Sequence, residues 1–406
     1  MSASTSMSTS TSTSMIYLDH NATTPPAPEV IDEMLDAMQR AWANPSSTHE
    51  PGQTARRLLA DARARVASFL GCQSAELVFT SGATEANHMA VLGALAHGRS
   101  SGGVRRRLVM SAVEHPGLLG LARRLETEGT PVDLIPVDAQ GRLDLDAARR
   151  LIGDGRDVAL LSVMGANNET GVLMPIAELV ALARAAGCWL HVDATQLVGK
   201  VALDFARSGV DLMSVSAHKL HGPKGIGALV VRKGVAVPAL LSGRQERHRR
   251  GGTENTPGIA GFAAACDLAA RTFDADLTRL RALGQVLENG LRRSLPAVQV
   301  YGDEAVRLPG TVYVRFGELD SERVLGRLER AGVVASSGAA CTASGTQPSH
   351  VLLAMGESAL QAKAGVRFSL GRDTTLDQIH RTLDIARHAI GPLLQPEADQ
   401  PLARAA

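Results

Sequence analysis

The feature that most constrains the fold is a regular alternation of short apolar runs with longer helical patterns. Apolar runs of strand length predict strands at Leu77–Phe79, Leu108–Val113, Val132–Val137, Val158–Met164, Trp189–Asp193, Leu212–Ser216 and Ala228–Val231. Helical patterns predict helices at Glu29–Ala41, Gln53–Leu70, Ala83–Ala96, Leu118–Glu128, Ile176–Ala186 and Leu376–Ile390. Strands that alternate with helices indicate an α/β fold with a mainly parallel sheet covered on both faces. Because ligands of such sheets bind at the carboxyl ends of the strands, the residues after each strand are the candidates for chemistry.

Past residue 262 the alternation gives way to a different order of elements. A long helical stretch at 274–294 precedes a predicted strand at 311–316 and a helix at 321–331, which is typical of a smaller α+β domain. Residues 1–14 hold eleven Ser or Thr and no charge, so we expect disorder there and no secretory signal. The predicted organisation is a disordered tail (1–14), an N-terminal segment that joins the small domain (15–27), a large domain (28–262), a small C-terminal domain that carries a cysteine loop (263–393) and a loose tail (394–406).

Charge and cysteine content argue against several classes of function. The 42 basic residues are balanced by 41 acidic ones, and aromatic residues make up 3% of the chain, so nothing favours direct binding of nucleic acid or of an anionic membrane. No apolar run reaches the roughly 18 residues of a transmembrane helix. The four cysteines form no CxxC pair, so no metal site is predicted. Unpaired cysteines are typical of the reducing cytoplasm, where we expect the protein to act.

A lysine directly after the strand at 212–216 is the candidate nucleophile. Lys219 stands in the segment Ser216–Gly225, which reads SAHKLHGPKG. Neighbouring cations and partial burial would lower the pKa of its amine and favour a Schiff base. The alternatives are a basic surface loop and Lys224, a second lysine in the same segment.

The preceding strand ends in an acid. Asp193 could form a salt bridge with a cationic ring nitrogen, the partner that pyridoxal 5'-phosphate (PLP) needs in order to act as an electron sink. Gln196 could donate a hydrogen bond to the phenolic oxygen of the same ring. The alternative for Asp193 is a cap of the following helix.

Two further strand ends offer an anion site and a histidine. Small residues open a helix at Ser81–Thr84, whose free N–H groups and dipole favour an anion, although no Walker lysine follows. His115 could lie over a planar cofactor and move protons, or it could cap the helix that Pro116 begins. Asn168 would bring an amide to the same edge of the sheet.

A cysteine and an arginine complete the candidates. Cys341 lies within Ser336–Gly345, ten small residues in a row, which suggests an accessible thiol on a movable arm. The alternative is an inert loop cysteine, and the other three cysteines are expected to pack. Arg367 could form a bidentate pair with a substrate carboxylate or a structural ion pair.

In their order along the chain these motifs resemble those of the cysteine desulfurases of the NifS/IscS group. That group belongs to the class-V aminotransferases, which are PLP enzymes of fold type I. The resemblance covers Tyr17 to Ile390 and includes Tyr17–Thr24 (YLDHNATT), Asn44–Ser47 (NPSS), Ser162–Met164 (SVM) and Arg250–Asn255 (RGGTEN). It implies a large domain with a mainly parallel seven-stranded sheet between helices, and a smaller α+β C-terminal domain.

The resemblance also implies a role for each candidate. The residues expected to bind PLP are Ala83, Thr84, His115, Asn168, Asp193, Gln196, Ser216, His218, Lys219 and Thr253. Lys219 would carry the Schiff base and His115 would stack on the ring, so both join Cys341 as catalytic residues. Asn168 and Arg367 would bind the substrate carboxylate. Thr253 would reach the phosphate bound by the neighbouring subunit, which implies an obligate homodimer.

The implied reaction removes sulfur from L-cysteine to give L-alanine and a persulfide on Cys341. The sulfur would pass to an acceptor protein such as an iron–sulfur scaffold, with a transient iron–sulfur contact at Cys341 as the one metal contact. The sequence departs from the family pattern at Ala83, Arg244 and His248, where glycines are expected. Alternatives that stay open are a selenocysteine lyase, another class-V enzyme such as an aminotransferase, and a non-catalytic scaffold of the same fold.

Overall fold

The structure is a computed structural model that describes residues 15–394 except 101, 339–340 and 343–344. For residues 341–346 it describes the backbone of four positions and no side chains. The predicted tail at 1–14 and residues 395–406 of the predicted loose tail lie outside the described residues. No helix among the described residues is long and apolar enough to cross a membrane.

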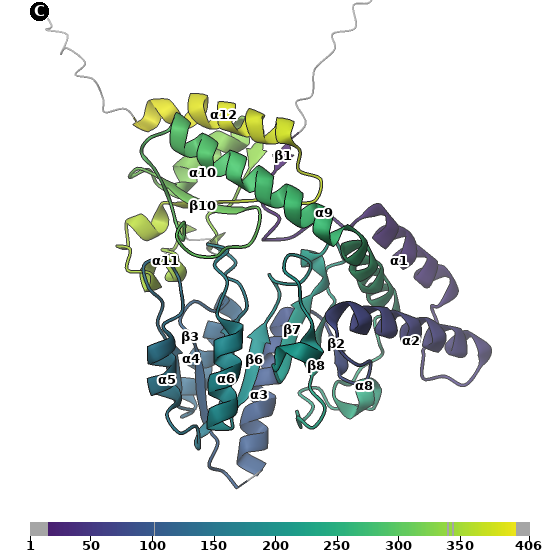
Figure 1. Cartoon of the computed structure of the whole chain (residues 1–406). Coiled ribbons are helices and arrows are strands. Elements are labelled where there is room, and N and C mark those ends of the chain that lie inside the picture. The colour runs from purple at the N-terminus through teal and green to yellow at the C-terminus, as the bar shows by residue number, and fades with distance from the viewer. Residues whose placement is uncertain (1–14, 101, 339–340, 343–344, 395–406) are drawn as a thin grey trace, which may run out of the picture.

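A seven-stranded sheet forms the centre of the larger part of the molecule (Figure 1). Its strands are β2 (Leu77–Thr80), β3 (Arg107–Ser111), β4 (Val132–Ile135), β5 (Val158–Met164), β6 (Trp189–Asp193), β7 (Leu212–Ser216) and β8 (Gly227–Val231). They lie in the order β2-β8-β7-β6-β5-β3-β4, and β8 alone runs antiparallel to its two neighbours. The predicted mainly parallel sheet is therefore confirmed.

Two predicted strands end earlier than expected. The strand predicted to reach Val113 stops at Ser111, because the Ser111 hydroxyl accepts a hydrogen bond from the backbone N–H of Val113 and turns the chain. The strand predicted to reach Val137 stops at Ile135, because Pro136 has no N–H to continue the ladder.

Helices cover both faces of this sheet. They are α1 (Pro28–Arg40), α2 (Glu50–Leu70), α3 (Ala83–Ser100), α4 (Pro116–Thr127), α5 (Leu145–Ile152), α6 (Ile176–Ala186) and the short α7 (Phe205–Ser208) and α8 (Gln245–His248). The period of two in the strands decides which side chains face which layer. In β3, Leu108 and Met110 join the apolar cluster under α3 and α4, whereas Val109 points to the opposite face. Because both faces are covered, every residue of β5 is buried.

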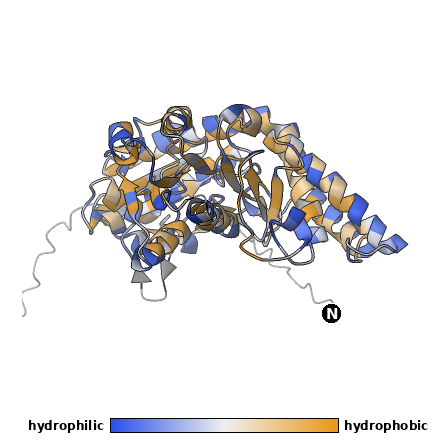
Figure 2. Cartoon of the chain, turned by 90° about the horizontal axis from the view of Figure 1, so that it is seen from below, coloured by the Kyte–Doolittle hydropathy of each residue, from blue (hydrophilic) through white to orange (hydrophobic). Residues whose placement is uncertain are grey.

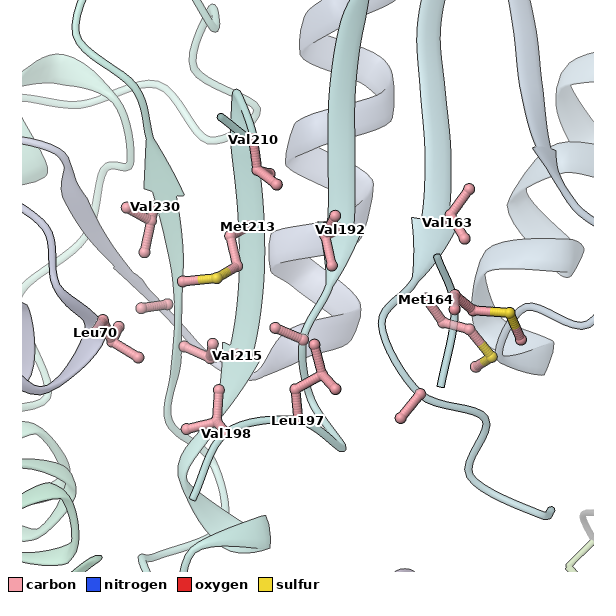
Figure 3. Close-up of a cluster of buried hydrophobic side chains, with 14 of the residues drawn as sticks. Leu70, Val163, Met164, Val192, Leu197, Val198, Val210, Met213, Val215 and Val230 are labelled. Atoms are coloured by element: carbon pink, nitrogen blue, oxygen red, sulfur yellow. The ribbon is translucent and has the colours of Figure 1, made fainter. Parts of the chain in front are cut away.

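Figure 3 shows part of the second apolar layer, on the face away from α3. Side chains of four adjacent strands, β5 to β8, lie there: Val163, Val192, Met213, Val215 and Val230. Leu70 from α2 and two residues of the loop after β6, Leu197 and Val198, pack beside them. α2 ends where Gly71 adopts the left-handed conformation with φ of 66° and its N–H caps the last turn. The helices alternate hydrophilic and hydrophobic residues in Figure 2, as expected for helices that pack on one side.

A three-stranded antiparallel sheet forms the centre of the smaller part. It contains β9 (Val298–Val300), β10 (Thr311–Phe316) and β14 (Gly365–Ser369) in the order β14-β10-β9. The other elements are α9 (Thr256–Ser294), α10 (Ser321–Arg330), α11 (His350–Ala354), α12 (Leu376–Leu394), the parallel pair β1 (Ile16–Tyr17) and β11 (Val333–Val334), and the antiparallel pair β12 (Cys341–Thr342) and β13 (Gly345–Thr346).

The long helix α9 connects the two parts. Its first half packs against α1 and α2, and its second half packs against α12 and the small sheet (Figure 1). The predicted domain boundary at 262/263 falls inside this helix, and the division into domains stays a prediction. β1 pairs with β11 of the smaller part, which brings the N-terminal segment to that side of the molecule.

Candidate active site

A cavity of about 590 Å³ opens at the carboxyl ends of the parallel strands. β2 contributes to the same edge because both β2 and β7 run antiparallel to β8 and therefore parallel to each other. The cavity is lined by ten of the predicted site residues: Ala83, Thr84, His115, Asn168, Asp193, Gln196, Ser216, His218, Lys219 and Arg367. Segments spread over nearly 300 residues of the chain thus meet in one place.

Lys219 lies in a single 3-10 turn, Ala217–Lys219, immediately after β7. Its ammonium donates hydrogen bonds of 2.6 Å to the backbone oxygens of Asn21 and Ala22. Burial lowers the pKa of the Lys219 amine to about 8, and the nearby Arg367 acts in the same direction. Near neutral pH a lysine with a lowered pKa has a larger fraction of unprotonated amine, which is the form that acts as nucleophile and base. The rival Lys224 also lines the cavity but is exposed.

Asp193 ends β6 and has a fixed orientation. One carboxylate oxygen accepts a hydrogen bond of 2.7 Å from the Asn87 amide of α3, and the other accepts one from the N–H of Thr195. Beneath it, His191 is fully buried between the hydroxyls of Ser162 and Ser214, each 2.8 Å away. Burial lowers the pKa of His191 to about 4, so its ring stays neutral. The carboxylate therefore has the geometry to hold a cationic ring nitrogen.

One end of the cavity lies at the N-terminus of α3, where Ala83 and Thr84 line it. The first amides of a helix have no partner within the helix, so those of Ala83 and Thr84 are available to an anion. Ser216 closes the site from β7. A side chain cannot replace Gly227 of β8 here, because a Cβ atom would lie 2.7 Å from Cα of Gly82. This close approach brings β8 against the turn that begins α3.

His218 and His115 line the cavity as uncharged rings. Nδ1 of His218 lies 3.1 Å from the Thr23 hydroxyl, and burial, assisted by Lys219, lowers its pKa to about 4. His115 does cap α4: its Nδ1 accepts a hydrogen bond from the N–H of Gly117, which leaves the proton of the neutral ring on Nε2. Burial lowers the pKa of His115 as well. His115 thus both caps α4 and lines the cavity, although the sequence offered these roles as alternatives.

Arg367 combines its two predicted roles in a similar way. It donates hydrogen bonds to the Asp19 carboxylate at 2.6 Å and to the backbone oxygen of Asn168 at 2.7 Å, so it is part of a structural ion pair. It nevertheless lines the cavity and is 3% exposed. Its Nε and the side-chain oxygen of Asn168 are buried and have no hydrogen-bond partner in the described part of the chain. Two orphaned polar atoms of this kind indicate a site built for a polar ligand.

The most connected residue of the site was not among the predicted site residues. The backbone oxygen of Asn21 accepts hydrogen bonds from Lys219 and from the Gln196 amide, and its side-chain oxygen accepts one from the half-buried Lys200. Lys200 also donates a hydrogen bond of 2.7 Å to Gln196 Oε1, which leaves the Gln196 amide nitrogen directed at the backbone oxygen of Asn21. Burial, with Lys219 nearby, lowers the pKa of Lys200 to about 7. Asn21 lies within Tyr17–Thr24, a segment that resembles the family pattern but to which the sequence analysis assigns no role in the site.

Thr253 does not line this cavity. It is exposed beside a smaller hollow that Ser81 and Gly225 also border. Arg250 forms an ion pair of 2.8 Å with Glu85 in the first turn of α3, which ties the loop before Thr253 to the anion site. An exposed Thr253 is available to a second subunit, and its role toward that subunit stays a prediction.

Of the three positions where glycines are expected, Arg244 and His248 differ from each other in backbone conformation. Arg244 has an ordinary right-handed backbone with φ of −95°, so no glycine is required there. His248 has φ of 63°, in the left-handed region that favours glycine. The backbone of Cys341 lies in β12, and its side chain lies outside the described residues.

The residues fit PLP as a cofactor on chemical grounds. The cavity contains an amine with a lowered pKa, an oriented carboxylate, an anion site at a helix N-terminus and an unpaired buried guanidinium N–H, Nε of Arg367. These groups match an aldehyde, a cationic ring nitrogen, a phosphate and a carboxylate respectively.

Comparison with known proteins places the chain in a family. The model of class-V aminotransferases matches residues 16–382. A cysteine desulfurase of Frankia sp. is 44% identical over 389 residues, which covers 93% of this chain and 91% of the relative. A cysteine desulfurase of Gluconacetobacter diazotrophicus is 44% identical over 381 residues, which covers 93% of this chain and 94% of that relative.

Solved structures agree with the sequence relatives. A NifS-like protein superimposes with a TM-score of 0.85 at 30% identity, over 93% of this chain and 99% of its own. A structure of SspA in complex with cysteine gives a TM-score of 0.76 at 29% identity, over 89% of this chain and 100% of its own. The chain belongs to the class-V aminotransferase family. Within it, the relatives matched over nearly their full length are cysteine desulfurases, and the resemblance, the fold class and the enzyme class predicted from the sequence are confirmed.

Proposed function

We propose that the protein is a PLP-dependent cysteine desulfurase that uses Lys219 and Cys341. The observation that carries the proposal is the convergence of Lys219, Asp193 and Arg367 on one cavity in a chain 44% identical to cysteine desulfurases. The name of the relatives supports L-cysteine as the substrate, and so does the similar solved structure of SspA in complex with cysteine.

Each end of the cavity suits one part of the cofactor. Ala83, Thr84, Ser216 and His218 would hold the phosphate, and His115 would lie against the ring. Asp193, held by Asn87, would keep the ring nitrogen protonated. When bound, PLP stabilises the electron pair that remains on the substrate after its Cα proton is removed.

The chain's own groups then account for the reaction. Arg367 and Asn168 bind the substrate carboxylate, which orients the Cα–H bond toward Lys219. The Lys219 amine, whose pKa is lowered to about 8, accepts the Cα proton and returns it later. The Cys341 thiolate attacks the substrate sulfur, the Cβ–S bond breaks, and its electron pair stays with the carbon. L-cysteine and a thiol thus become L-alanine and a persulfide, with no external oxidant or reductant.

The proposal includes a homodimer and a sulfur acceptor. α1 exposes Ile31, Leu35 and Met38 in one stripe, and Trp42 beyond the helix is 72% exposed, which supports burial against a second copy. Thr253 would complete the partner's phosphate site. The persulfide would pass in the cytoplasm to an acceptor such as an iron–sulfur scaffold.

Two substitutions test the proposal. Cys341→Ala should keep the visible absorbance of bound PLP but release no sulfide from L-cysteine, whereas Cys72→Ala, the matched control, should turn over normally. Lys219→Ala should lose the borohydride-reducible lysine–PLP adduct, and Lys224→Ala should keep it. Normal sulfide release by Cys341→Ala, or an adduct that maps to Lys224, would contradict the assignment.

A further inference from the structure

A buried carboxylate joins the two ends of the segment that carries Cys341. This segment leaves the described core at Gly338 and returns to it at Ser349. Ser349 donates a hydrogen bond of 2.5 Å from its hydroxyl to Oε2 of Glu169. At the other end, a Cβ atom on Gly338 would lie 3.1 Å from Cγ of Glu169, so the backbone of Gly338 packs directly on that side chain.

Tyr313 of β10 adds a second link at the first end. Its hydroxyl lies 2.9 Å from the backbone oxygen of Ser337 and 3.2 Å from Oε2 of Glu169. Tyr313 is fully buried, and burial with the neighbouring Glu169 raises the pKa of its hydroxyl well above the usual value, so it remains a donor. Oε2 of Glu169 therefore contacts one end of the segment directly, at Ser349, and the other end by way of the Tyr313 hydroxyl, which also contacts Ser337.

Neither ion pairing nor cavity contact accounts for the burial of Glu169. The residue is 1% exposed, does not line the cavity and forms no ion pair with the described side chains. Burial raises the pKa of its carboxyl. His350 and Arg367 act on the carboxyl only as nearby charges, and the hydrogen bonds that offset its burial come from Ser349 and Tyr313, at the two ends of one segment.

The same short loop connects Glu169 to the cavity. The side-chain oxygen of Asn167 accepts hydrogen bonds from the N–H groups of Glu169 and Thr170, which fixes the turn after β5. In this turn Asn168 lines the cavity, and the next residue, Glu169, contacts both segment anchors, of which Gly338 also lines the cavity.

We propose that Glu169 is a positioning residue for Cys341, which fixes both ends of the 338–349 segment relative to the turn that carries Asn168. The inference rests on the proposed function of Cys341 as sulfur acceptor. It predicts that Glu169 matters for sulfur transfer to Cys341 and not for the binding of L-cysteine or of PLP.

Hydrogen exchange of the PLP-loaded enzyme tests the anchors without reference to turnover. Tyr313→Phe should speed amide exchange about tenfold in peptides that cover 334–338, and Ser349→Ala should do so in peptides that cover 349–353. Glu169→Ala should speed exchange at both ends, and Glu169→Gln, which keeps the shape and an acceptor oxygen, should remain near the wild type. Unchanged exchange at both ends in Glu169→Ala would overturn the proposal.

Single-turnover kinetics test the consequence. After mixing with L-cysteine, formation of the Cys341 persulfide is followed by mass spectrometry. Its rate in Glu169→Ala should be lower than in the wild type by about tenfold or more. The spectrally measured affinity for L-cysteine should stay within about twofold, and Glu169→Gln should restore the rate. If Glu169→Ala is too unstable to purify, Tyr313→Phe and Ser349→Ala should each show a smaller slowing of the same kind. Equal loss of cysteine affinity and rate would overturn the inference, whereas absence of a Cys341 persulfide in the wild type would overturn the proposed function instead.

Discussion

Lys219 illustrates how a single residue of the site is held in an unfavourable state. Its pKa is lowered to about 8 in the folded protein, whereas a lysine in an unfolded chain titrates near ~10.4. Between these values the unfolded chain binds more protons than the folded one, so the contribution of Lys219 to stability rises with pH. Below about pH 8 both states are protonated, and the full penalty of burying the charge is present.

Substitution of Lys219 should therefore change stability in a pH-dependent way. In the PLP-free protein, Lys219→Met should be more stable relative to the wild type at pH 7 than at pH 10, as measured by urea midpoints. The exposed Lys224→Met should show no such trend. A stability difference that is the same at both pH values would contradict the burial of a charged Lys219.

His248 offers a second prediction at the scale of one residue. Its left-handed backbone is strained for a residue with a Cβ atom, so His248→Gly should raise the free energy of unfolding by about 1 kcal/mol. Arg244→Gly is the matched control in the same exposed loop. Because Arg244 is right-handed, a glycine there should lower stability by about 0.5–1 kcal/mol. Urea midpoints of the two variants should move in opposite directions.

At the scale of elements, the site depends on how closely β8 approaches the start of α3. A methyl group on Gly227 would meet the backbone of Gly82 at 2.7 Å and the oxygen of Val215 at 2.5 Å. Neither contact is with a flexible side chain, so the turn before α3 would have to move. That movement would displace the amides of Ala83 and Thr84 that form the anion site.

Gly227→Ala should accordingly weaken PLP binding by about tenfold or more, measured by absorbance titration of the PLP-free protein. Gly120 in α4 has open space where its Cβ would lie. Gly120→Ala should leave PLP affinity unchanged and stabilise the helix by up to about 1 kcal/mol. Full PLP affinity in Gly227→Ala would show that the anion site tolerates the shift.

The helix α9 shows where sequence patterns fail at this scale. A helix was predicted from residue 274, whereas α9 begins at Thr256. Residues 259–266 are buried on every side, so they lack the amphipathic period that reveals a helix. Gly261 permits close contact with α1, where a Cβ would lie 2.6 Å from Cγ of Met34. Tertiary packing, and no local pattern, defines this half of the helix.

At the scale of the whole molecule, the exposed Thr253 leads to a test of the homodimer. If Thr253 serves the partner's site, a dimer of one Lys219→Ala chain and one Thr253→Ala chain contains one site with both native residues. Mixing equal amounts of the two weakly active variants under conditions that exchange subunits should then restore activity toward roughly a quarter of the wild-type value, because about half of the dimers are mixed and each has one native site. If Thr253 served its own chain, both sites of the mixed dimer would remain defective and no activity would return.

Local sequence patterns are enough to predict most strands and helices in their order along the chain and the residue types that follow each strand. Period-two apolar runs and strand ends are local properties, so they predicted the sheet, the cavity edge and most of the residues that line it, including Lys219 and Asp193. The family pattern added roles that no spacing could supply.

The contacts that hold those residues in place depend on the three-dimensional fold. The direction of β8, the hydrogen bonds of Asn21 to Lys219 and Gln196, and the contact of Glu169 with Ser349 join positions up to 198 residues apart. The physical reason is that a buried polar group must find its partner in space, and the fold, rather than the neighbouring sequence, brings that partner within reach.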